Sequence, residues 1–134
     1  MTPMKPIRKI DIQVIEHTAQ RYDTSGDWWF DPDGTLHIAV SKMSDPRFAL
    51  LVAMHELTEA LLCHHAGITT EEVDAWDMGE GAKLDEPGDD PRAPYHEQHV
   101  AAMFAERWMA DKFGVDWTAY AEAFDDLPAH PGNK

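Results

Sequence analysis

The sequence predicts a small α+β domain, in which a short antiparallel sheet lies beside a buried central helix and two or three further helices. Three observations predict this class. A Pro-Asp-Gly turn at residues 32–34 separates two aromatic or β-branched runs, which indicates a β-hairpin. An apolar run between two capping signals indicates one buried helix over residues 46–66. A chain of 134 residues suits a single domain, 1–134, with a modest core, and we expect a flexible tail over about 126–134.

The strand signals lie in the N-terminal third of the chain. Residues 7–21 are ambiguous, because their apolar positions fit a helix while Ile10, Ile12 and Val14 also alternate as in a strand. The predicted hairpin covers residues 27–41. In its second half apolar residues alternate with more polar ones, so we expect this strand to bury one face.

The predicted helices are marked by residues that favour helix ends. Asp45 and Pro46 favour a helix start, and Gly67 favours its end. A capping box begins at Thr69 and predicts a short helix that ends near Met78. The same kinds of signal predict a long loop rich in Gly, Pro and Asp over 79–94, a helix from 94 or 95 to 114, and a last helix from 116 to about 124.

The composition excludes some classes of partner. The chain has 25 acidic residues against 11 Lys and Arg, a formal net charge of −14. Binding to nucleic-acid phosphates or to an anionic membrane needs a basic face, so we expect neither. Cys63 is the single cysteine, and the N-terminus lacks the continuous apolar core of a signal peptide. We therefore expect a cytoplasmic protein.

A cluster of polar residues interrupts the most apolar part of the chain. In the run over residues 48–62, every polar side chain falls between His55 and Glu59. Burying two carboxylates beside an imidazole is costly unless a partner neutralises them, and one divalent metal ion would do so. Positions i and i+4 share a helix face, so His55 and Glu59 can bind one ion together. Glu56 then lies where the general base of an H-E-x-x-H metallohydrolase lies.

A second polar cluster, residues 95–99, can supply the third metal ligand. A catalytic zinc usually has three protein ligands and one open position. His99 is the preferred third ligand because it lies further into the predicted helix, whereas His96 lies in the first turn; Asp77 is a reserve ligand. Tyr95 could polarise the carbonyl oxygen of a substrate. The expected cofactor is one divalent ion, with Zn²⁺ as the default and Mn²⁺ or Fe²⁺ also compatible with a glutamate ligand.

A β-hairpin followed by a His-Glu-x-x helix and a further helix with a third ligand resembles the minimal zincin metallopeptidase arrangement, over about residues 27–110. The resemblance implies a single-metal hydrolase that acts on peptide or amide bonds of a peptide or protein substrate. Most zincins have a histidine where this chain has Glu59. Segments 55–63, 67–74 and 86–99 are also similar to segments of short, uncharacterised phage and prophage proteins, which implies a phage-associated origin in a bacterial host cell.

Three alternatives use the same residues differently. The cluster around His55 could be a buried ion-pair network satisfied by an arginine, with Arg8, Arg21 and Arg107 as candidates. It could hold a structural metal in a non-catalytic interaction protein, with His96 or Asp77 closing a shell of four ligands. The acidic composition could instead belong to an inhibitor that imitates nucleic acid, in which case no metal is expected.

Overall fold

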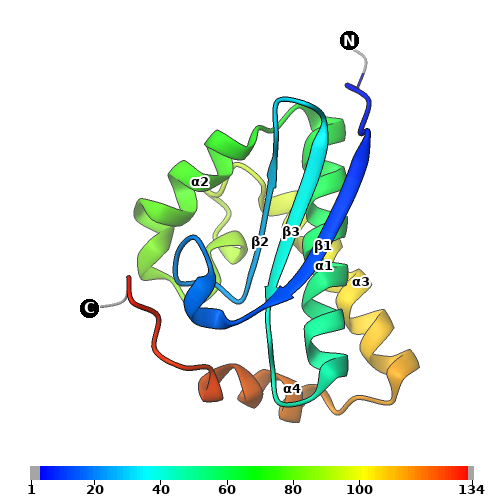
Figure 1. Cartoon of the computed structure of the whole chain (residues 1–134), viewed down its shortest axis with the longest axis vertical. Coiled ribbons are helices and arrows are strands. Elements are labelled where there is room, and N and C mark those ends of the chain that lie inside the picture. The colour runs from blue at the N-terminus through cyan, green and yellow to red at the C-terminus, as the bar shows by residue number, and fades with distance from the viewer. Residues whose placement is uncertain (1–3, 133–134) are drawn as a thin grey trace.

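The computed structural model describes residues 4–132 and confirms an α+β fold (Figure 1). Its sheet has the order β1-β3-β2, with β1 at Lys9–Ile15, β2 at Gly26–Phe30 and β3 at Thr35–Ser41. The predicted hairpin is confirmed, since β2 and β3 pair antiparallel across the turn. Leu36, Ile38 and Val40 of β3 share one face and are fully buried, as their alternation predicts. Most of the other face is buried as well, at Thr35, Ala39 and Ser41.

The expectation of a purely antiparallel sheet is wrong for β1. The ambiguous segment forms a strand, and β1 pairs parallel to β3, so the sheet is mixed. A short 3₁₀ helix, η1 (His17–Ala19), follows β1 at the end of the sheet, and the chain then enters β2 in the opposite direction. Alternation of apolar residues can indicate a strand, but whether that strand pairs parallel or antiparallel depends on the path of the rest of the chain.

Helix α1 (Pro46–Ala66) has the predicted bounds. The Asp45 side chain accepts a hydrogen bond from the Arg47 amide, and Gly67 ends the helix with a φ of 78°, a conformation that favours glycine. One side of α1 packs against the sheet and another against α3 (His96–Phe113). The core that they share includes Leu36, Ile38, Val40, Leu51, Val52 and Ala60.

The predicted buried central helix, α1, is buried on only part of its surface. Leu50 is 51% exposed, and Leu61 and Leu62 are also exposed. The sheet and α3 cover only two sides of the helix, and a domain of this size has no further layer to cover the third. The polar cluster lies on the covered side.

The remaining helices begin and end close to the predicted residues. α2 (Thr70–Met78) starts at the Thr69 cap, and α4 (Trp117–Ala123) starts at the Asp116 cap and continues into the 3₁₀ helix η4 (Phe124–Asp126). The Arg47 guanidinium near the start of α1 donates to the Phe113 carbonyl at the end of α3, so the two helices run antiparallel.

Only one residue in the described part of the expected tail, 126–132, is buried. His130 is buried, and its Nε2 atom donates a hydrogen bond to the Gln20 carbonyl oxygen at 3.0 Å. Residues 133–134 of the expected tail lie outside the described residues. Within residues 4–132, no helix combines the length and the hydropathy that crossing a membrane requires.

Candidate metal centre

Helices α1 and α3 bring together three of the four predicted ligand residues: His55, Glu59 and His99. The atoms His55 Nε2, Glu59 Oε2 and His99 Nδ1 lie 3.2 Å from one another in all three pairs. All three side chains are buried. Within residues 4–132 they form the one group of His, Cys, Asp and Glu side chains with a spacing suited to a metal ion.

The dimensions of this triangle fit a zinc-sized cation. Zinc–nitrogen and zinc–oxygen bonds of about 2.0–2.1 Å in a tetrahedron place neighbouring ligand atoms about 3.3 Å apart. The observed separations of 3.2 Å are close to that value. Two imidazoles and one carboxylate are also a ligand set that divalent zinc, manganese and iron accept.

Two further carboxylates orient the histidine rings. His55 Nδ1 donates to Glu106 Oε1 at 2.8 Å, and His99 Nε2 donates to Asp89 Oδ1 at 3.0 Å. In a neutral imidazole, a proton on one nitrogen leaves the lone pair on the other. When both rings are neutral, their lone pairs therefore point into the triangle beside Glu59, where a cation would satisfy them.

The electrostatic environment keeps Glu59 ionised. Burial raises the pKa of Glu59, but hydrogen bonds with His55 and His99 outweigh burial and lower the pKa to about 2. The Trp28 indole on β2 also donates to Glu59 Oε1 at 3.0 Å and leaves Oε2 to face the histidines. One carboxylate oxygen is thus occupied by the protein, and the other is directed at the candidate site.

Glu56 lies beside the triangle, where the sequence predicts a general base. Its Oε2 atom is 4.0 Å from His55 Nε2. Burial, and then the negative charge of Glu59, raise the pKa of Glu56 well above its usual value. Gly26 on β2 makes room for this side chain, because a Cβ atom there would lie 2.8 Å from Glu56 Cγ.

Tyr95, His96 and Asp77 lie outside the triangle. The Tyr95 and Tyr22 hydroxyls both donate to Asp77, and burial raises the pKa of that carboxyl to about 6 despite these bonds. His96 Nδ1 donates to the Gly88 carbonyl at 2.8 Å. Asp77 and His96 therefore form hydrogen bonds with groups outside the triangle, and the Tyr95 hydroxyl is directed at Asp77.

The alternative in which an arginine satisfies the buried cluster does not hold for the described residues. Arg21 pairs with Asp27 at 2.7 Å and with Asp74 at 3.1 Å, and Arg107 stacks over the Trp117 ring. Arg8 is exposed. The ion pairs that His55, Glu59 and His99 make are with one another and with Glu56, Asp89 and Glu106.

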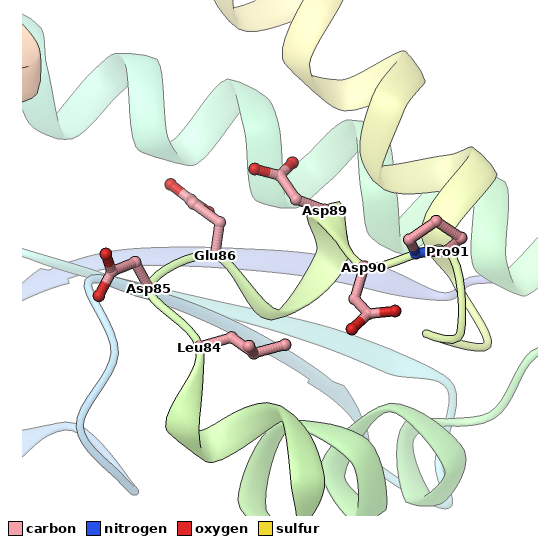
Figure 2. Close-up of a pocket in the computed structure, with 6 residues that line it drawn as sticks. All are labelled: Leu84, Asp85, Glu86, Asp89, Asp90 and Pro91. Carbon is pink, nitrogen blue, oxygen red and sulfur yellow. The ribbon is translucent and has the colours of Figure 1, made fainter.

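The predicted long loop forms one wall of the centre. It contains two short 3₁₀ helices, η2 (Glu80–Lys83) and η3 (Pro87–Asp89), and Trp76 Nε1 donates to the Pro87 carbonyl. Figure 2 shows the Glu86 and Asp89 side chains directed towards α1, and Asp89 also accepts the hydrogen bond from His99 on α3. An open hollow of about 420 Å³ adjoins them, lined by Leu84, Asp85, Glu86, Asp89, Asp90 and Pro91. The centre is therefore bordered by an acidic surface hollow.

Four residues at the centre have no role that the sequence predicts: Trp28, Gly88, Asp89 and Glu106. Glu106 is seven residues after His99 on the same helix, so the sequence places both on one helix face but gives Glu106 no role there. Asp89 and Trp28 come from distant segments and carry no such signal. Gly88 approaches His99 so closely that a Cβ atom would lie 2.4 Å from His99 Cγ.

No family model matches this chain, and no match exists among the curated proteins or the solved structures that were compared with it. The resemblance to zincin metallopeptidases and to phage proteins therefore stays a prediction. A functional proposal has to rest on the geometry of the centre.

Proposed function

We propose that the protein is a single-metal hydrolase that cleaves peptide or amide bonds. The observation that carries this proposal is the triangle of His55 Nε2, His99 Nδ1 and Glu59 Oε2, with all three separations at 3.2 Å. Its two imidazoles and one carboxylate would hold one divalent cation. Zn²⁺ is the first choice for this ligand set, and Mn²⁺ or Fe²⁺ is compatible with it.

Glu56 supports a hydrolytic role. In such a centre, a divalent cation would lower the pKa of bound water and polarise a substrate carbonyl. Glu56 accepts the proton that the attacking water loses and donates it to the leaving nitrogen. A raised pKa suits the first of these steps, because it makes Glu56 a stronger base than an ordinary carboxylate.

The number of available ligands favours catalysis over a structural metal. A structural zinc site is closed by four protein ligands, whereas a catalytic site keeps one position open. The two residues that could have closed the shell are held elsewhere, His96 by the Gly88 carbonyl and Asp77 by two tyrosine hydroxyls. Three protein ligands remain, with Glu56 beside them.

The first test is the metal content of protein purified without a histidine tag, measured by inductively coupled plasma mass spectrometry. We expect about one equivalent of Zn, Mn or Fe in the wild type, as three protein ligands predict, and loss of the metal in Glu59→Ala. A wild-type protein that stays free of stoichiometric metal after reconstitution would exclude the hydrolase.

The second test separates metal binding from catalysis. Glu56→Gln keeps the shape of the side chain but removes its ability to take a proton, so we expect full metal content with peptide cleavage reduced at least about 100-fold. The substrate is a mixed peptide library, and cleavage is read by mass spectrometry. A metal-loaded wild type without cleavage would leave a structural metal centre and contradict the enzymatic part of the proposal.

A further inference from the structure

β1 is an edge strand, and its outer backbone has no partner strand within residues 4–132 (Figure 1). A free row of backbone N–H and C=O groups is a template for a further strand. The strand continues as extended chain at both ends. The Arg8 amide bonds to the Gly34 carbonyl before it, and Glu16 has an extended backbone conformation after it.

Three side chains of β1 form an exposed apolar row beside the core. The parallel register sets Ile10, Ile12 and Val14 beside the three fully buried core residues of β3, on the same face of the sheet. The β1 residues are nevertheless 46%, 45% and 53% exposed. Three neighbouring β-branched side chains of this kind are unusual on a solvent-facing strand and indicate an interface.

The sequence of this face is complementary to itself. Arg8, Ile10, Ile12, Val14 and Glu16 alternate along one face, with a basic residue at one end and an acidic residue at the other. An antiparallel pairing centred on Ile12 sets Ile12 against its own copy and Ile10 against Val14. The same register sets Arg8 against Glu16 at both ends. Arg8 and Glu16 are exposed and have no ion pair with another described residue.

We propose that β1 pairs antiparallel with β1 of a second copy of this chain, which forms a two-fold symmetric dimer with a continuous six-stranded sheet. The occupant is a second copy because the strand supplies its own apolar and charged complement. A chain with a net charge of −14 repels itself through most surfaces, whereas this face carries charges of both signs. β1 supplies no residue to the metal centre, so the dimer does not depend on the proposed function.

Sedimentation velocity on the full chain at rising concentration tests the dimer. We expect a monomer–dimer equilibrium for the wild type and for the metal-site variant Glu59→Ala. Ile12→Asp sets two like charges opposite each other at the symmetry axis, so we expect a dimer at least about tenfold weaker. The matched control is Met78→Asp, which removes an exposed apolar residue from α2, beside β2 at the opposite edge of the sheet, and should leave the dimer unchanged.

Charge reversal tests the register without removing an apolar residue. Arg8→Glu and Glu16→Arg each set like charges opposite each other twice, so each variant alone should dimerise about tenfold more weakly. An equimolar mixture of the two restores both ion pairs, and so does the double variant, so both should dimerise like the wild type. A monomeric wild type, a dimer insensitive to Ile12→Asp, or a mixture that stays as weak as the single variants would overturn the proposal.

Discussion

At the scale of single residues, the two ring nitrogens of His55 depend on each other. The hydrogen bond made by Nδ1, which faces away from the triangle, determines what Nε2 can bind. The bond from Nδ1 to Glu106 fixes the tautomer, and the Tyr120 hydroxyl in turn donates to Glu106 Oε2 at 2.5 Å. A carboxylate in this position usually raises the affinity of the histidine for its metal. The series of hydrogen bonds Tyr120–Glu106–His55 therefore predicts that a residue that is not itself a metal ligand affects metal affinity.

Glu106→Ala should weaken metal binding by about 10–100-fold, because the His55 ring loses the acceptor that orients it. The dissociation constant can be measured by competition with a chelating dye. Tyr120→Phe is the matched control, since it keeps the Glu106 carboxylate and removes only the outer hydroxyl; we expect a smaller change. Equal affinities for Glu106→Ala and the wild type would contradict a metal centre at His55.

Among the elements, the 79–94 segment differs most from what its composition suggests. Gly, Pro and Asp indicate a loop, and two 3₁₀ helices and several hydrogen bonds to neighbouring helices hold it in place. The close approach of Gly88 to His99 positions Asp89 on the same ring. The segment thus belongs to the centre and is more than a connection.

Gly88→Ala should displace either the η3 turn or the His99 ring, since the added Cβ atom would lie 2.4 Å from His99 Cγ. We expect a metal affinity lower by about tenfold or more, as for the loss of an orienting contact. The dye competition serves here too. Thermal unfolding of the metal-free variant is the control, because an unchanged affinity with a lower melting temperature would show that the contact is only structural.

The ends of the helices could be predicted from the sequence because they depend on neighbouring residues. Asp45, Gly67 and Thr69 mark boundaries through their own side chains or backbone, within one turn of the helix end. The parallel pairing of β1 and the contact of Asp89 with His99 join distant segments. Neither leaves a periodic signal. The same distinction applies to the centre, where the i, i+4 pair of α1 was predictable and Trp28 was not.

Thr69→Ala tests one of these local signals. The Thr69 hydroxyl caps α2 by accepting a hydrogen bond from the Glu72 amide at 3.2 Å. Loss of an N-cap typically costs about 1 kcal/mol of unfolding free energy. Urea denaturation should show this loss without a change in metal affinity, whereas Thr118→Ala, an exposed position in α4, should not destabilise the protein. A Thr69→Ala variant as stable as the wild type would show that tertiary contacts alone hold α2.

For the whole molecule, the fold couples metal binding to proton binding. Burial lowers the pKa of His55, but hydrogen bonds with Glu106 and Glu59 outweigh it and raise the pKa from 6.5 to about 11. The pKa of His99 is also raised, by Glu59, against the effect of burial. The metal-free protein therefore carries a proton where the cation would bind.

Metal affinity should consequently rise with pH. A cation that displaces one proton from His55 binds about tenfold more tightly for each unit by which the pH rises, up to about 11. The proton itself stabilises the metal-free fold. Because the folded pKa lies above the unfolded value, that stabilisation is complete below pH 6.5 and is lost as the pH rises towards 11. The two effects have opposite signs, so the rise in melting temperature on adding Zn²⁺ should grow steadily with pH in the wild type. Glu59→Ala should show no such rise, and a pH-independent effect of Zn²⁺ on both proteins would point to binding elsewhere on the acidic surface.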